Sequence, residues 1–191
     1  TGAVRGTQYV GGVAGNSGGT ITNAYNTGAV SGSDDVGGVA GWNYSNITNA
    51  YNTGAVSGAS NVGGVAGYNA SSGTIKNALW AKDLSYETET GKSKPTKAVG
   101  NVDDSDTVKS VALADMKKAA TYSNWSNDGD DTIDSTVASE GNKGTAWRIY
   151  EGYTTPLLTS FFKGVVTVTG LDSKETTYNG TTQTVDTSGA V

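Results

Sequence analysis

The chain of 191 residues contains no cysteine and no histidine, and its first 80 residues carry almost no charge. Without cysteine there are no disulfide bonds and no thiol chemistry, and without histidine the commonest general base and transition-metal ligand are missing. The only charged side chains in residues 1–80 are Arg5, Asp34, Asp35 and Lys76. The other 27 of the 31 lie in residues 81–191, so we place a boundary near Trp80 and expect a protein that is not an enzyme.

Charge and hydropathy also narrow the range of partners. The isoelectric point near 4.6 and the lack of a basic cluster remove the electrostatic footprint of nucleic-acid binding and of anionic-membrane binding. No run of about 18 or more apolar residues is present, so we expect no insertion into a membrane. The amino-terminal residues do not form a charged-then-apolar signal.

What the chain does contain is a sequence repeat. The string V-G-G-V-A-G and the string T-G-A-V-[RS]-G each occur three times, with a spacing of 26 residues. Their first residues are Val10, Val36 and Val62, and Thr1, Thr27 and Thr53. A third string, I-[TK]-N-A, begins at Ile21, Ile47 and Ile75, and its last interval is 28 because the loop from Tyr68 to Thr74 is longer. Internal periods of this length indicate units that stack on copies of themselves.

The composition of the repeat predicts an all-β fold. Its apolar residues form short β-branched segments separated by glycine and asparagine, and no helical periodicity is sustained. We therefore predict a parallel β-solenoid of about three 26-residue coils over residues 1–80, with three short strands per coil and about 4.8 Å between coils. Three inward ladders are expected to form its core: Val13, Val39 and Val65; Ile21, Ile47 and Ile75; Val30 and Val56.

Aligned polar and aromatic residues are the candidates for ligand contact. Asn23, Asn49 and Asn77 align, and we favour a structural amide ladder over a ligand-binding row. Tyr25 and Tyr51 also align, and such a row could hold a sugar or simply stabilise the sheet. The variable loop between strands contains further candidates, namely Asn43, Asn46 and Asn69.

The repeat resembles the GLUG repeat. The core G-G-[LV]-[VA]-G of that family is present at Gly11–Gly15, Gly37–Gly41 and Gly63–Gly67, and its companion I-x-N-A-Y-N-T-G-x-V-x-G is present twice in full. The string W-R-I-Y-E-G-Y-T-x-P-L-L from Trp147 to Leu158 also resembles what commonly follows such repeats. The resemblance implies a right-handed parallel β-helix in a secreted adhesin of the bacterial cell surface, similar to filamentous haemagglutinin and exported by two-partner secretion. It also implies an outer-membrane export partner for the parent chain, a role in cell adhesion and virulence, and contact with a host cell-surface glycan or protein.

Two other functions remain open for such a sequence. The GLUG repeat also occurs in IgA-cleaving metalloproteases, so the chain could be a non-catalytic accessory domain, because the H-E-x-x-H motif is missing here. A carbohydrate-active β-helix such as a polysaccharide lyase would need Asp, Lys and Arg clustered on one coil face, and the repeats hold only four charges.

The rest of the chain is expected to cap the solenoid and then lead away from it. The third repeat loses its last arm after Leu79, so we expect the solenoid to end there and residues 81–162 to form a polar loop, a short α-helix between Val111 and Tyr122, and an aromatic plug on the last coil. The plug is expected to contain Met116, Trp125, Trp147, Ile149 and Leu157. Residues 163–191 should be a strand or linker that leads into a truncated β-module of the Y-D-G type.

Two acidic segments could offer oxygen ligands to Ca²⁺. They are Asn127–Asp131 with Asp134, and Asp103–Asp106. Neither has the spacing of an EF-hand loop, so we favour solvated acidic loops and expect no cofactor.

Overall fold

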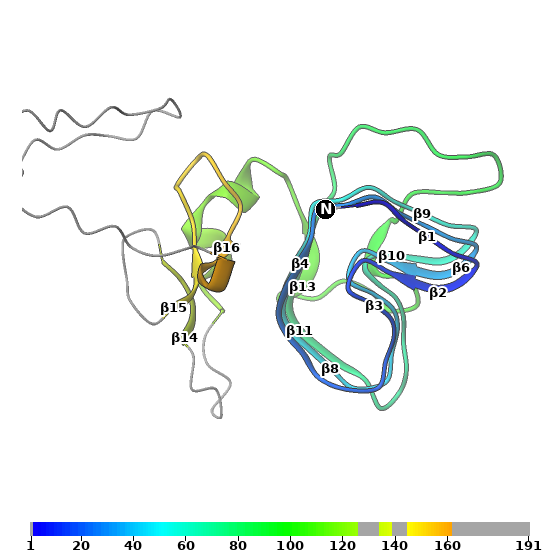
Figure 1. The fold of residues 1–191 in the computed structure, drawn as a ribbon, viewed down its shortest axis with the longest axis horizontal. Coiled ribbons are helices and arrows are strands. Elements are labelled where there is room, and N and C mark those ends of the chain that lie inside the picture. The colour runs from blue at the N-terminus through cyan, green and yellow to red at the C-terminus, as the bar shows by residue number, and fades with distance from the viewer. Residues whose placement is uncertain (1, 126–133, 139–144, 162–191) are drawn as a thin grey trace, which may run out of the picture. The chain divides into compact units, whose positions relative to one another are not determined.

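The computed structural model describes residues 2–125, 134–138 and 145–161, and residues Thr1–Phe161 belong to one compact unit. Most of the described chain is a parallel β-solenoid in which each strand pairs with its equivalent in the next coil (Figure 1). Among the described residues, no helix has the length and hydropathy that crossing a membrane requires.

Three parallel sheets form the walls of the solenoid. The first consists of β1 (Val4–Arg5), β5 (Val30–Ser31) and β9 (Val56–Ser57). The second consists of β2 (Gln8–Gly11), β3 (Ala14–Ser17), β6 (Asp34–Gly37), β7 (Ala40–Asn43), β10 (Ser60–Asn69) and β12 (Lys97–Val99). The third consists of β4 (Ile21–Asn26), β8 (Asn46–Asn52), β11 (Thr74–Ala81) and β13 (Val108–Val111).

The register of these sheets follows the sequence repeat. Val36 pairs with Val10 on one side and with Val62 on the other, as the 26-residue period predicts. Ile47 pairs with both Ile21 and Ile75, although the second interval is longer. A turn at residues 70–73 accommodates the two extra residues, and the Gly73 N–H closes it by donating to the Ala70 carbonyl oxygen at 2.9 Å.

The solenoid does not end at Leu79, and this prediction was wrong. Strand β12 pairs in parallel with β10, and β13 pairs in parallel with β11, so residues 97–111 add part of a fourth turn. The carboxylate of Asp104 joins the two new strands, because its oxygens accept the N–H groups of Ala98 at 2.7 Å and Ser110 at 3.1 Å. These residues lack the V-G-G-V-A-G string, so the periodicity alone does not predict them.

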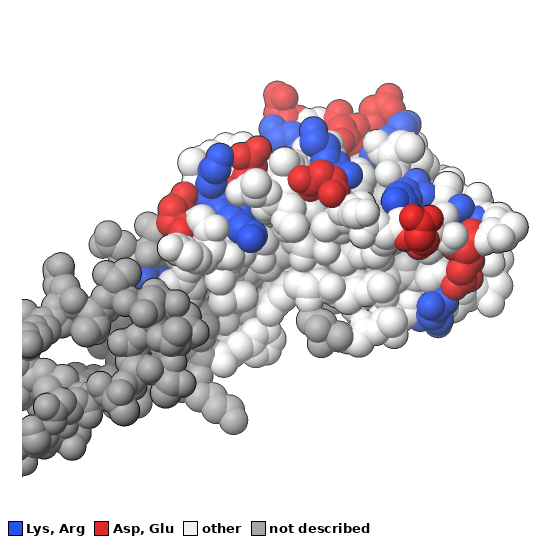
Figure 2. All heavy atoms as spheres, turned by 90° about the horizontal axis from the view of Figure 1, so that it is seen from above, with Lys and Arg blue, Asp and Glu red and all other residues white. Residues whose placement is uncertain are grey.

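The segment between β11 and β12 covers the exposed edge of β9. The Tyr86 hydroxyl donates to the Val56 carbonyl oxygen at 2.8 Å and accepts the Val56 N–H at 3.3 Å. Ser93 forms an isolated antiparallel bridge with Gly58. Covering an edge in this way prevents it from pairing with another chain. The segment also carries charged side chains, and its Glu89 forms ion pairs with Arg5 and Lys92. Figure 2 shows one face of the molecule, with charged side chains gathered along one side of it.

The interior of the solenoid is made of valine, isoleucine and alanine. Val39, Val65 and Ile47 are fully buried in one cluster, and Val30 and Val56 are buried in a second. Ile21 and Ile75 are half-buried against the first cluster. Each buried side chain of this size contributes roughly 1.5 to 3 kcal/mol.

Val13 is the exception among the residues expected in the core. It stacks on Val39, because its N–H donates to the Val39 carbonyl oxygen at 2.9 Å, but 47% of its surface is exposed. The prediction that Val13 is buried was therefore wrong. Val13 lies in the first coil, where the described residues provide no strand on the outer side, so only one neighbour covers it.

Paired glycines allow the coils to approach closely at the second sheet. A Cβ added at Gly37 would lie 2.1 Å from the Ala40 carbonyl oxygen and 2.6 Å from the Cα of Ala66. A Cβ at Gly64 would lie 2.1 Å from the indole ring of Trp80. Real Cβ atoms do not make such contacts, so these positions of the V-G-G-V-A-G string require glycine.

Aligned asparagines serve the backbone and each other. Asn23, Asn49 and Asn77 have φ values of 53°, 53° and 51°, a left-handed conformation that asparagine adopts more readily than most residues. The Asn77 amide donates to Oδ1 of Asn49 at 3.0 Å, and the Asn26 amide donates to Oδ1 of Asn52 at 2.9 Å. These contacts agree with structural ladders for the pairs Asn49–Asn77 and Asn26–Asn52. Asn23 instead accepts the Trp147 indole N–H, and the Asn49 amide N–H has no acceptor among the described residues.

The residues after the fourth turn pack against the outer surface of the third sheet. They include a small sheet of β14 (Asp134–Ala138), β15 (Thr145–Arg148) and β16 (Leu157–Leu158), together with the 3₁₀ helices η1 (Asp115–Lys117), η2 (Ala119–Tyr122) and η3 (Thr159–Phe161). We call the described residues from 112 to 161 the cap. Its contacts reach three coils, through Asn23, Tyr51 and Asn77. The cap therefore covers the side of the solenoid. The prediction that it covers the end of the last coil was wrong.

The prediction of a short α-helix at residues 111–122 was also wrong. Two 3₁₀ helices replace it, and Lys118 between them has an extended conformation with φ −114° and ψ 129°. Neither helix has a side-chain N-cap. Short turns of this kind can follow the surface of a sheet where a regular helix would project from it.

The aromatic plug of the cap is present. Met116, Trp125, Trp147 and Ile149 are buried in one cluster with Tyr122. Leu157 is half-buried in β16, where it pairs with Arg148, and its neighbour Leu158 packs against the cluster instead. The predicted strand or linker at residues 163–191 lies outside the described residues.

Candidate functional site

The tyrosine row that we considered for ligand contact is covered by the cap. Tyr51 is fully buried, and its hydroxyl donates to the Pro156 carbonyl oxygen and lies 3.1 Å from Oγ1 of Thr155. The ring of Tyr25 stacks on that of Tyr51, with 5.2 Å between centroids, and lies 6.0 Å from the ring of Trp147. The prediction of a ligand-facing row was therefore wrong for Tyr51, because the chain's own cap occupies this surface.

Burial gives the tyrosines beneath the cap a pH dependence. Desolvation raises the pKa of Tyr51 and of Tyr122 above the ordinary value of 10.0. A pKa that is higher in the folded than in the unfolded state favours folding fully below pH 10, and this contribution is lost as the pH rises above 10.

We expect the free energy of unfolding to fall steeply above pH 10, as measured by urea denaturation with tryptophan fluorescence. Tyr51→Phe should be about 1 kcal/mol less stable at pH 7 but should depend less on alkaline pH; equal alkaline slopes would contradict this assignment.

The three asparagines of the variable loop differ in their surroundings. Asn43 is fully buried, and its amide donates to Oδ1 of Asn69 at 2.7 Å and to the Ser45 carbonyl oxygen at 2.8 Å. Asn69 is half-buried and donates to the Gly73 carbonyl oxygen at 3.0 Å. Asn46 is exposed at the start of β8. The prediction of a ligand-facing side chain was thus wrong for Asn43, which holds the loop instead.

Beside this loop lies an exposed aromatic cluster that the sequence analysis missed. We call Tyr9, Trp42, Tyr44 and Tyr68 the aromatic ledge. The Trp42 ring lies at its centre, with centroid distances of 4.6 Å to Tyr68, 5.1 Å to Tyr9 and 5.3 Å to Tyr44. Tyr9 is 40% and Tyr44 44% exposed.

A departure from the repeat could have revealed the ledge. Trp42 pairs in register with Asn16 in the first coil and with Tyr68 in the third, so the repeat does not fix the residue type there. The positions that recur in every coil are those that stabilise the fold. Positions that differ between otherwise identical coils are free of that constraint, and Trp42 is one of them.

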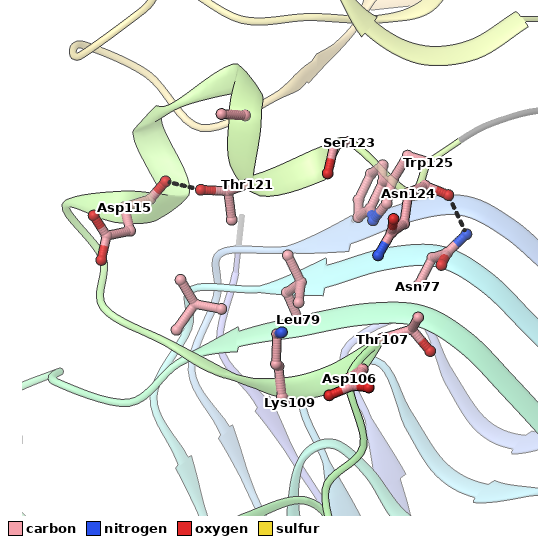
Figure 3. A pocket seen from close by; sticks show the side chains of 12 residues that line it. Asn77, Leu79, Asp106, Thr107, Lys109, Asp115, Thr121, Ser123, Asn124 and Trp125 are labelled. Atoms are coloured by element: carbon pink, nitrogen blue, oxygen red, sulfur yellow. Dashed lines mark hydrogen bonds between the residues drawn. The ribbon is translucent and has the colours of Figure 1, made fainter.

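A groove separates the outer surface of the third sheet from the 3₁₀ helices of the cap (Figure 3). Its cavity measures about 370 Å³. Leu79 and Lys109 come from β11 and β13, and Thr121 comes from η2. Asp115 lies at one end, and at the other the Asn77 amide donates to the Asn124 carbonyl oxygen at 2.9 Å.

The polar groups of the groove are partly used within the fold. The Asp115 carboxylate pairs with Lys118 at 2.7 Å, and the Asp115 carbonyl oxygen accepts the Thr121 hydroxyl at 2.6 Å. Asp106 and Lys109 remain as charged groups on the wall formed by the solenoid (Figure 3). The groove can therefore hydrogen-bond a small polar molecule.

The acidic segments considered for Ca²⁺ divide between described and undescribed residues. Asp103 pairs with Lys97 at 2.6 Å, and Asp104 accepts the two backbone N–H groups that join β12 and β13. Residues 127–131 and the side chain of Asp134 lie outside what the structure describes. Within the described residues, no group of three or more acidic side chains is arranged to hold a metal ion.

Comparison with known proteins adds one finding to this geometry. Residues 32–57 match the GLUG motif family, and the matched stretch contains β6, β7, β8 and β9, which is one full coil. The chain therefore contains a GLUG-repeat region within a β-solenoid. No curated protein and no solved structure matches the chain.

Proposed function

We propose that this chain is a structural and cell-adhesion module of a secreted bacterial surface protein, similar to filamentous-haemagglutinin-type adhesins. The observation that carries the proposal is the in-register solenoid built from GLUG repeats, one of which matches the family over residues 32–57. Such a stack adds about 4.8 Å per coil along one axis, so it serves to hold other parts of a protein away from a cell. The parent chain would be exported through an outer-membrane partner.

The cap supports a mechanical role for the module. It bonds to the first coil through the Trp147 indole N–H, which donates to Oδ1 of Asn23 at 3.0 Å. It bonds to the second coil through Tyr51 and to the third through Asn77. Separate coils are thereby linked by side-chain contacts as well as by their strands, and pulling one coil away would also break the cap contacts.

We propose a non-enzymatic role. The chain has no histidine or cysteine, and the repeats hold only four charged residues, which is fewer than a polysaccharide lyase would need on one coil face. An accessory domain of a surface protease would share the same solenoid and the same location.

The location can be tested on intact cells of the source bacterium. Antibodies raised against the purified chain should label unpermeabilised cells, and brief treatment with an external protease should remove the label. Beads coated with the chain should bind host cells more than beads coated with the Val39→Asp variant. Labelling that needs permeabilisation would contradict a surface location, and release of unsaturated sugars from a polysaccharide by the pure chain would favour the lyase.

A further inference from the structure

We infer that the aromatic ledge is a binding platform for neutral carbohydrate. This inference rests on the proposed function, because it names the ligand class that the module would contact. Tyr9 comes from β2, Trp42 from β7 and Tyr68 from β10, so three coils contribute to the platform. Tyr44 follows β7 directly, and its ring lies nearly parallel to that of Trp42, at 16°.

The ledge is not required by the fold. Asn16 stands in the first coil where the second has Trp42, and that coil still pairs in register. Tyr9 occupies the position of Asp35 and Asn61 in the following coils, and all three have positive φ values, of 54°, 51° and 46°. Asparagine and aspartate adopt that conformation far more readily than tyrosine. The first coil therefore holds a strained tyrosine where the other coils hold a better suited residue.

Trp42, the central residue of the ledge, also has an unpaired hydrogen-bond donor. The indole N–H of Trp42 has no hydrogen-bond acceptor in the described structure. Buried polar hydrogens are nearly always paired, and an exception needs an explanation. Asn49, Trp80 and Arg148 also have an unpaired buried donor, so the strained Tyr9 is the feature that marks the ledge as a cluster serving binding rather than stability.

The chemistry of the ledge points to sugars rather than to charged ligands. Aromatic rings with a negative π face attract the C–H groups on the apolar face of a pyranose. The repeats contain only Arg5 and Lys76 as cations, and Arg5 is paired with Glu89, so the ledge lacks the basic groups that nucleic acids require. The exposed amide of Asn16, which lies in register with Trp42, can bond sugar hydroxyls.

Titration of the purified chain with soluble oligosaccharides tests this inference. The probes are hexasaccharides of glucose, mannose, galactose and N-acetylglucosamine, and the readout is the set of indole N–H signals in a proton–nitrogen NMR spectrum. We expect one sugar to shift the Trp42 signal saturably, while the signals of the buried Trp125 and Trp147 stay in place. Trp42→Asn, which introduces the residue of the first coil, should weaken binding by roughly tenfold or more.

Two further variants separate binding from folding. Tyr9→Asn introduces the residue of the third coil, so we expect weaker sugar binding with an unchanged or higher melting temperature. Tyr153→Asn, in an exposed residue of the cap, should leave binding unchanged. The inference is overturned if no sugar shifts the Trp42 signal at about 10 mM, if Trp42→Asn binds as the parent does, or if the ledge signals shift only with protein concentration, which would indicate pairing of two copies. These outcomes concern the purified chain, and antibody labelling of cells tests the surface location separately.

Discussion

The substitution Val39→Asp should unfold the solenoid. Val39 is fully buried in the second coil, with Val13 on one side and Val65 on the other. A carboxylate there would lose its water without gaining a partner, and the apolar contacts of the valine would also be lost. An uncompensated buried charge costs about 3 to 5 kcal/mol, a large part of the stability of a domain of this size. Circular dichroism should therefore show no cooperative melting and a weak β signal.

The repeat provides a matched control for this substitution. Val13→Asp changes the equivalent residue of the first coil, where nearly half of the side chain meets solvent. Its effect should stay within about 1 kcal/mol, because the carboxylate remains hydrated. Equal melting temperatures for the two variants would mean that the interior of the solenoid is not where the structure places it.

The substitution Trp147→Ala should release the cap from the side of the solenoid. The Trp147 ring is fully buried, contacts the rings of Tyr51 and Trp125, and bonds to Asn23. Truncating a buried tryptophan costs about 3 to 5 kcal/mol. Limited proteolysis should then cleave the chain after β13, at Val111, while the repeats remain protected.

An exposed aromatic residue of the same segment serves as the control. Tyr153 is 82% exposed, so Tyr153→Ala should leave both the melting temperature and the protease pattern unchanged. If Trp147→Ala behaves in the same way, the cap does not depend on its plug, and the contact with the tyrosine row is not what holds it.

The stacking of the repeats could be predicted from the sequence because identical residues recur at a fixed distance. Val36 lies between Val10 and Val62 in the structure as it does in the repeat. The fourth turn gives a weaker signal, since only Val99 and Gly100 continue the pattern of Ala66 and Gly67. A Cβ at Gly100 would lie 2.5 Å from the Gly67 carbonyl oxygen, so the close approach of the coils persists after the sequence motif has faded.

The position of the cap could not be predicted in the same way. Periodicity reports contacts between neighbouring coils, but it says nothing about which segment covers an outer surface. A ligand-facing role for Tyr25 and Tyr51 therefore stayed open beside a structural one, although Trp147, 96 residues after Tyr51 in the chain, packs on them. The aromatic ledge could not be predicted from the repeat either, because Trp42 pairs with Asn16 and Tyr68 and so departs from the recurring pattern.

Cross-linking between equivalent positions of two coils tests the stacking most directly. Because the chain has no native cysteine, only the introduced thiols can form a disulfide. Ser31 and Ser57 pair in register, with 3.2 Å between their hydroxyl oxygens. Cα atoms of neighbouring strands lie within the range of about 4.4 to 6.8 Å that a disulfide needs. Mild oxidation of the double variant Ser31→Cys, Ser57→Cys should therefore give an intramolecular disulfide in nearly every molecule. The pair Ser31→Cys, Ser72→Cys, whose second residue lies in the loop between β10 and β11, should stay reduced. A first pair that stays reduced, or that links only separate chains, would contradict the stacked repeat.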